Sequence, residues 1–224
     1  MRIACLHTAD SNIAVFDAAA EALGLTPDTL SHHSRPDLLA AAVAAGQLTP
    51  YIQQQACDAL VELAQTADLV LLTCSTLGPS ATQADALTTV PVWRVDEALA
   101  TQAMAKAGKT QVLYAVETTL LPTQQLFERV SRHPQAEVEF VLVEGAWQKF
   151  MDGDVAGYVQ NVAAAADQAF QQGADKVALA QASMAGAVDL TQFGAPLSSP
   201  RCGLRVAIEH LRKRQYEAGL QQNS

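Results

Sequence analysis

The chain has 224 residues, half of them hydrophobic and only 5% aromatic, with a formal net charge of −9. This length allows one large domain or two small ones, and the negative charge argues against a surface for nucleic acids or anionic membranes. The N-terminal residues MRIACLHTAD contain no signal-peptide core, and no run of about eighteen apolar residues occurs. We therefore expect a cytoplasmic protein with no nucleic-acid partner and no membrane partner.

Strand and helix patterns alternate along the whole chain. In the first half, they predict a strand at 2–8, a helix at 13–23, a weak strand at 30–33, a helix at 36–45, a helix that begins at 50, and a strand at 69–73. In the second half, strands are predicted at 92–95, 111–116, 138–143, 177–180 and 196–198, and helices at 96–107, 122–132, 154–172, 184–190 and 201–218. Such alternation, with unbroken apolar strands, predicts an α/β fold with parallel sheets covered by helices.

Two stretches about a hundred residues apart share one pattern. LVLLTCSTLGPS, at 69–80, and VALAQASMAGA, at 177–187, each contain an apolar strand, a small polar residue and the start of a helix. The polar residue is Cys74 in the first and Ser183 in the second. This duplication predicts two lobes, with a boundary near residues 91–96.

Cys74 is the strongest candidate for a reactive group. The four cysteines, Cys5, Cys57, Cys74 and Cys202, are scattered without CxxC spacing, as expected for reduced thiols. A thiol between a strand and a helix N-terminus favours the thiolate, so we expect the pKa of Cys74 to be lowered toward neutrality. It would then act as a nucleophile or a base. The alternative is an inert residue at the end of a core strand.

Small polar residues follow several predicted strands, where ligands gather in open α/β sheets. The residues at these strand ends, most of which carry small hydroxyl groups, are His7, Thr8, Asp10, Ser11, Cys74, Ser75, Thr76, Glu117, Thr118, Thr119, Glu144, Ser183 and Met184. Hydroxyls together with backbone N–H groups suit a small carboxylate, and no dinucleotide or P-loop motif occurs. We expect Ser183 to be a helix N-cap, alone or together with a substrate contact, rather than a nucleophile. No further metal ligand lies near His32 and His33 in the sequence, so no metal is predicted.

The sequence resembles the aspartate/glutamate/hydantoin racemase superfamily. The resemblance rests on LLTCSTLGP around Cys74, PVWRVDEALA at 91–100, ETTLLPT at 117–123, VALAQASMAGA at 177–187 and APLSSPRCGL at 195–204. It implies two pseudo-symmetric α/β lobes, residues 1–95 plus 200–224 and residues 96–199, with the active site in the cleft between them. In such families two cysteines face each other across the acidic carbon of the substrate, without a pyridoxal or metal cofactor.

The resemblance also implies roles for residues of this chain. Cys74 becomes the acid/base of the first lobe. The carboxylate-binding candidates are Ser75, Thr76, Thr118 and Thr119, with Thr8 and Ser11 on the opposite wall. Ser183 stands where the second cysteine is expected, so the candidate catalytic pair is Cys74 and Ser183.

This departure leaves three interpretations within the superfamily. The protein is a one-base isomerase or epimerase, a single-cysteine decarboxylase or other lyase, or a racemase with another proton carrier, for which Cys202 is one candidate. Outside the superfamily, a thiol hydrolase would pair Cys74 with His7, and a catalytically silent protein would only bind a small carboxylate. The substrate stays open, and a homodimer is a reasonable expectation.

Overall fold

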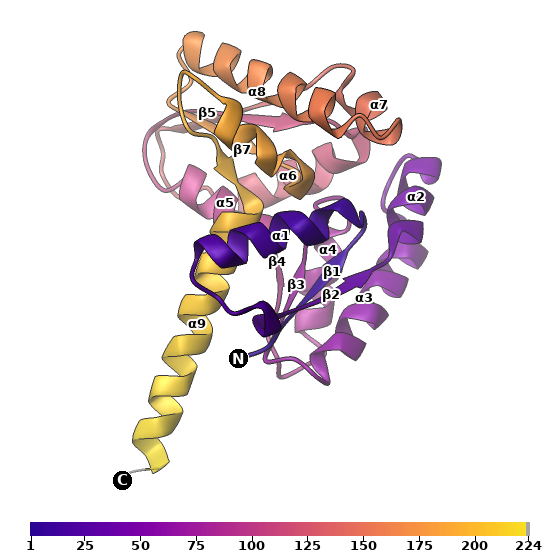
Figure 1. Cartoon of the computed structure of the whole chain (residues 1–224), viewed down its shortest axis with the longest axis vertical. Helices are drawn as coiled ribbons and strands as arrows, with labels where there is room; N and C mark the ends of the chain where they lie inside the picture. Colours follow the sequence, from indigo (N-terminus) through magenta and orange to yellow (C-terminus); the bar gives the residue numbers. More distant parts are fainter. Residues whose placement is uncertain (223–224) are drawn as a thin grey trace.

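The computed structural model describes residues 1–222 and contains two four-stranded parallel sheets with the same strand order. The first sheet has the order β2-β1-β3-β4, with β1 (Ile3–His7), β2 (Leu30–Ser34), β3 (Leu69–Leu72) and β4 (Val92–Arg94). The second has the order β6-β5-β7-β8, with β5 (Gly108–Tyr114), β6 (Ala136–Leu142), β7 (Lys176–Leu179) and β8 (Leu197–Ser198). The predicted α/β fold is therefore confirmed, and Figure 1 shows the two sheets in separate halves of the molecule.

Burial explains which segments form central strands. Every residue of β1 and β3 is buried, as expected for strands covered by helices on both faces. The edge strands β2 and β6 are partly exposed, and they carry polar side chains that cover the open edge. The continuous apolar runs in the sequence thus mark the centre of each sheet.

Helices cover both sheets. In the first half of the chain they are α1 (Ser11–Ala22), α2 (Pro36–Ala45), α3 (Pro50–Ala64) and α4 (Gly78–Asp85), with the 3₁₀ turn η1 (Pro27–Thr29). In the second half they are α5 (Asp96–Ala103), α6 (Glu117–Val130), α7 (Ala146–Met151), α8 (Val155–Gln171), the 3₁₀ helix η2 (Ala182–Leu190) and α9 (Ser199–Gln222). Thr49 caps α3, because its hydroxyl oxygen accepts a hydrogen bond from Ile52 N–H at 3.3 Å.

Three elements differ from the prediction. Helix α6 begins at Glu117 and contains Pro122, which was expected to start it. A proline at the sixth helical position removes the hydrogen bond to the carbonyl four residues earlier and crowds that carbonyl, but the helix continues through it to Val130. The segment 182–190 forms a 3₁₀ helix, and the short helix α7 was not predicted.

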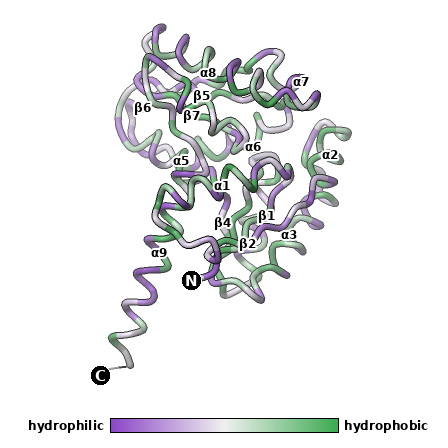
Figure 2. Tube along the Cα trace, viewed as in Figure 1, coloured by the Kyte–Doolittle hydropathy of each residue, from purple (hydrophilic) through white to green (hydrophobic). Residues whose placement is uncertain are grey.

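Helix α9 connects the two halves of the molecule. It packs against α1 on one side and α5 on the other. A Cβ added at Gly203 of α9 would lie 2.4 Å from Val95 Cγ2 and 2.8 Å from the Val95 carbonyl oxygen. The second half of α9 extends away from both sheets (Figure 1), and most of its residues there are hydrophilic (Figure 2). The predicted boundary between residues 95 and 96 stays a prediction, and residues 223–224 of the predicted first lobe lie outside the described part.

Among the described residues, no helix combines the length and the apolar character needed to span a membrane.

Candidate functional site

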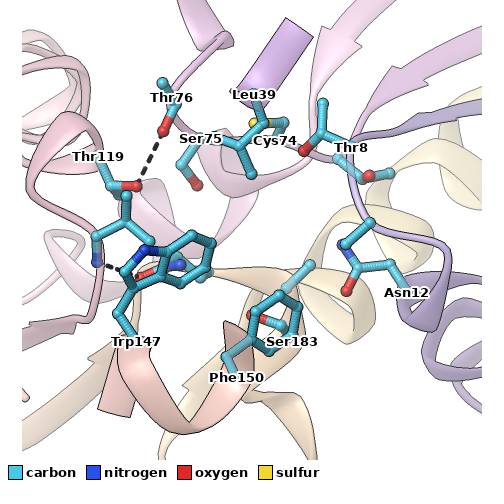
Figure 3. Close-up of a pocket in the computed structure, with 15 residues that line it drawn as sticks. Thr8, Asn12, Leu39, Cys74, Ser75, Thr76, Thr119, Trp147, Phe150 and Ser183 are labelled. Carbon is cyan, nitrogen blue, oxygen red and sulfur yellow. Dashed lines mark hydrogen bonds between the residues drawn. The ribbon is translucent and has the colours of Figure 1, made fainter. Parts of the chain in front are cut away.

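A small cavity lies where the carboxyl ends of strands from both sheets meet (Figure 3). Its walls are formed by Thr8, Ala9, Asn12, Leu39, Thr73, Cys74, Ser75, Thr76, Val116, Thr119, Trp147, Phe150, Gln181, Ala182 and Ser183. The water-accessible space is about 30 Å³, room for roughly two water molecules. This space is smaller than a small organic acid.

Cys74 follows β3 and lines this cavity, with only 8% of its surface exposed. Burial raises the pKa of its thiol above the usual value. Hydrogen bonds from the Thr8 hydroxyl and from the backbone at Leu77 and Thr76 act in the opposite direction, but they do not outweigh burial. The expected lowering of the Cys74 pKa is therefore wrong, because burial has the larger effect on this thiol. The thiol is the resting form, and these donors stabilise a thiolate once it has formed.

Hydroxyl groups from both sheets meet beside Cys74. Thr76 Oγ1 lies 3.1 Å from Thr119 Oγ1 and 3.3 Å from Thr118 Oγ1, so hydrogen bonds join the start of α4 to α6. The Ser75 hydroxyl donates a hydrogen bond to the Ala180 carbonyl at the end of β7. Thr118 is buried in this group but does not line the cavity, whereas Thr119 does. These contacts hold the two halves together at the site.

Ser183 lies on the cavity wall contributed by the second half of the chain (Figure 3). It is not the N-cap of η2, since Gln181 takes that position, and the N-cap expectation is therefore corrected. Its Oγ lies 2.8 Å from the hydroxyl oxygen of Tyr158, a fully buried residue of α8. Burial raises the pKa of Tyr158, so its phenol stays protonated. Ser183 is thus linked to a second, buried hydroxyl.

Three residues with predicted substrate contacts lie outside the cavity wall: Thr118, described above, and also Ser11 and Met184. Ser11 is exposed at the start of α1, and Met184 is fully buried in the core of the second half. Consecutive residues of a helix point about 100° apart, so the neighbours Asn12 and Ser183 face the cavity instead.

Two amide side chains of the cavity wall were not predicted. Asn12 is 5% exposed, and its Oδ1 atom has no hydrogen-bond partner among the described residues, which leaves it free to accept a hydrogen bond. Gln181 Oε1 accepts hydrogen bonds from the backbone N–H groups of Ala115 at 2.7 Å and Val116 at 3.3 Å. With its oxygen engaged, Gln181 can offer a ligand only its Nε2 donor.

Two aromatic side chains of α7 close the cavity and were also missed. Trp147 and Phe150 stack with ring centroids 5.2 Å apart and an interplanar angle of 14°, and both cover the cavity in Figure 3. Phe150 also packs on Tyr158, with ring centroids 5.2 Å apart. The only sequence signal for this wall is an aromatic residue shortly after a predicted strand.

His7 and Cys202 do not form part of the cavity wall. Both ring nitrogens of His7 are engaged elsewhere, Nδ1 with Thr73 Oγ1 at 2.9 Å and Nε2 with His32 Nδ1 at 2.9 Å. Burial, reinforced by His32, lowers the pKa of His7 to about 4. Cys202 Sγ donates to Gln102 Oε1 at 3.4 Å, in a groove between α5 and α9. The arrangement needed for a hydrolase, with His7 bonded to Cys74, is absent.

The fold and the site define a two-lobed α/β protein with a thiol and hydroxyl groups in the cavity between its lobes. A sequence profile of the family described as Asp/Glu/Hydantoin racemase matches residues 7–201. The chain therefore belongs to this family. No curated protein sequence matches it.

Solved structures share the fold at low sequence identity. Allantoin racemase from Pseudomonas fluorescens is 17% identical with a TM-score of 0.65, over 95% of this chain and 91% of that chain. Glutamate racemase from Bacillus anthracis is 14% identical with a TM-score of 0.61, over 96% of this chain and 82% of that one. A point mutant of arylmalonate decarboxylase in its sulfate-associated form is 15% identical with a TM-score of 0.59, over 93% of this chain and 92% of that chain.

Proposed function

We propose that the protein is a cofactor-independent enzyme that racemises, epimerises or isomerises a small carboxylic acid at its acidic carbon, with Cys74 as the acid/base. One observation supports this most directly. Among the described residues of the cavity wall, Cys74 alone carries a side chain acidic enough to act as a proton acid/base, and hydroxyl and amide groups surround it. A carbon acid needs a base on one side and donors that stabilise its carboxylate as negative charge develops.

In the first step, the Cys74 thiolate removes the proton from the acidic carbon. The C–H bond breaks, an S–H bond forms, and the electron pair moves toward the carboxylate. Thr76, Thr119 and the Nε2 group of Gln181 supply donors for that charge. Because burial raises the pKa of Cys74, the rate of this step increases with pH.

Ser183 is the proton donor for the opposite face of the acidic carbon. A hydroxyl delivers a proton to carbon only when another donor replaces it, and the Tyr158 hydroxyl at 2.8 Å is placed to do so. This transfer leaves a tyrosinate in a buried site, where the charged form is disfavoured. We therefore expect the proton to return from Cys74 more often than from Ser183, so that hydrogen exchange with retention outpaces racemisation.

The cavity walls favour a substrate with one charge and a flat apolar group. Within residues 1–222, no Lys, Arg, Asp, Glu or His side chain lines the cavity, so an ammonium group or a second carboxylate would have no charged partner there. Trp147 and Phe150 instead offer an aromatic surface. Aryl-substituted acids and hydantoins fit this wall better than aspartate or glutamate.

A single-cysteine decarboxylase is the second candidate function. Loss of CO₂ from a malonate-type acid leaves a carbanion that needs only one proton donor, so the single thiol in this cavity is sufficient. The apolar surface of Trp147 and Phe150 would favour this loss, because a carboxylate is less stable where water is excluded.

The test is proton NMR in deuterated water with a panel of aspartate, glutamate, hydantoins, arylacetic acids, malonates and maleate. We expect loss of a Cα–H signal with the native protein, no loss with Cys74→Ala, and full activity with Cys202→Ser, whose thiol lies outside the cavity. Optical rotation of the same samples separates retention from racemisation, and release of CO₂ from malonates would identify the decarboxylase. If a panel member raises the melting temperature of native protein and Cys74→Ala alike, without turnover, the protein only binds its ligand and the proposal fails.

A further inference from the structure

We propose that Cys5, His7 and His32 form a binding site for a first-row transition-metal ion of the zinc class, separate from the Cys74 cavity. Cys5 Sγ and one ring nitrogen from each histidine lie within 4.8 Å of one another. None of the three lines the cavity.

The sheet itself brings the three side chains together. Cys5 and His7 are two residues apart on β1, so both point to the same face of the sheet. His32 on β2 is paired with Cys5 in the parallel register, so its side chain points to that face too. Adjacent parallel strands thus present one thiol and two imidazoles at one point, a donor set that suits Zn²⁺ or Co²⁺.

The outer nitrogens of both imidazoles already have the partners that a metal site requires. His32 Nε2 lies 3.0 Å from Asp17 Oδ1, and His7 Nδ1 lies 2.9 Å from Thr73 Oγ1. Thr73 donates its own hydroxyl proton to the Leu6 carbonyl at 3.1 Å, so its oxygen accepts from His7 Nδ1–H. Histidines that bind metals donate their second N–H to a carboxylate or another oxygen in this way.

The inner nitrogens point at each other. His7 Nε2 and His32 Nδ1 are 2.9 Å apart and share a hydrogen bond, so a metal ion bound here would replace the proton that lies between them. Two nitrogens bound to one tetrahedral zinc ion lie about 3.3 Å apart, so the rings need to separate by a few tenths of an ångström. His32 lies on an edge strand, with 16% of its side chain exposed, and has room for this movement.

The surroundings balance the charge of a bound ion and shield it. Asp17 and Asp10 both act electrostatically on His7, and a Cys5 thiolate would supply another negative charge. Phe16 packs edge-on against His7 with ring centroids 5.2 Å apart, and Cys5 is fully buried beside it. An ion held here would fasten the exposed edge strand β2 to the central strand β1. The sequence does not indicate the site, because 25 residues separate the two histidines.

The test is Co²⁺ binding by the full-length protein after treatment with a chelator. We expect visible absorption bands of tetrahedral Co²⁺ and a thiolate-to-cobalt band in the near ultraviolet, both saturating at one ion per chain. Cys5→Ser should remove the thiolate band, and His32→Gln should weaken binding by at least about tenfold. His33→Gln, at the exposed neighbouring position, and Cys57→Ser, at another buried thiol of the same half, should bind like native protein.

A second readout does not depend on colour. A hundredfold excess of Zn²⁺ over its dissociation constant should raise the melting temperature by about 5–10 °C, and His32→Gln should lose this shift even if Cys5→Ser does not fold. Cys74→Ser should bind Co²⁺ normally, so the result is independent of the proposed enzymatic function. The proposal is overturned if no saturable binding occurs, if the thiolate band survives Cys5→Ser, or if ¹⁵N NMR shows that the two histidines merely share a proton in the presence of Zn²⁺.

Discussion

Replacing Asp96 by Asn should strongly destabilise the protein, because it leaves a buried positive charge without its partner. Arg94 donates two parallel hydrogen bonds to Asp96, at 2.7 and 2.8 Å, and the two side chains are only 6% and 3% exposed. The remaining acceptor near the guanidinium is the Pro122 carbonyl at 3.5 Å. Gly78 packs so closely that a Cβ there would lie 2.3 Å from Arg94 Cζ, so the guanidinium cannot shift toward α4.

Breaking a buried ion pair at one partner costs about 3–5 kcal/mol. For a chain of this size, that loss lowers the melting temperature by about 6–20 °C. The chain also provides a matched control. Arg35 and Asp37 form the same two-residue, doubly bonded pair at 2.8 and 2.7 Å, but they are 37% and 59% exposed, so Asp37→Asn should cost less than about 1 kcal/mol.

Urea unfolding and calorimetry of both variants test this reasoning. The double variant Arg94→Met/Asp96→Asn, which removes the charge as well, should recover most of the stability lost in Asp96→Asn. If Asp96→Asn and Asp37→Asn are equally mild, burial does not control the strength of these pairs and the argument is wrong.

Three further predictions use other parts of the structure. Gly203→Ala should lower the free energy of unfolding by about 1–3 kcal/mol, because its Cβ would overlap Val95. At Gly219 a Cβ meets nothing within 4 Å, so Gly219→Ala should stabilise α9 by up to about 1 kcal/mol. Equal unfolding midpoints of the two variants in urea would contradict this prediction. Iodoacetamide should alkylate Cys74 slowly at pH 7 and faster toward pH 9 and above, because a raised pKa leaves little thiolate at neutral pH. Mass spectrometry measures the rate of alkylation. A rate that stops rising below pH 8 would refute this prediction. Tyr158→Phe should lower the free energy of unfolding by about 0.5–1.5 kcal/mol, because one hydrogen bond is lost. It should also slow racemisation more than deuterium exchange. An equal effect on both rates would exclude Tyr158 as a proton source.

The fold was largely predictable because its strongest features are local in sequence. The apolar run of β3 is buried on both faces, and the Thr49–Pro50 start of α3 follows ordinary capping rules. Helix α7 has six residues and is therefore too short for a hydrophobic period to emerge. The start of α6 was misplaced because a proline inside a helix gives the same signal as one at its beginning.

Part of the candidate site could be predicted for a similar reason. The carboxyl ends of parallel strands meet at one edge, and this rule brings Thr8, Cys74 and Ser183 to the cavity. The rule does not specify which residue of a following turn points inward, which is why Asn12 and not Ser11 lines the wall. The pKa of Cys74 was misjudged for another reason, since burial depends on the approach of the second half of the chain.

The close packing of Gly203 on Val95 has a consequence for how the molecule opens. The chain passes between the two sheets twice, once after β4 and once at the start of α9, and these two crossings touch where Gly203 meets Val95. Because these two connecting segments touch each other, they form one hinge. We expect the two halves of the molecule to move relative to each other by rotation about this hinge. The aromatic pair on α7 and the first turn of α1 lie on opposite sides of the cavity (Figure 3). We expect such a rotation to carry them apart and to widen the cavity, while Cys74 keeps its place shortly after β3.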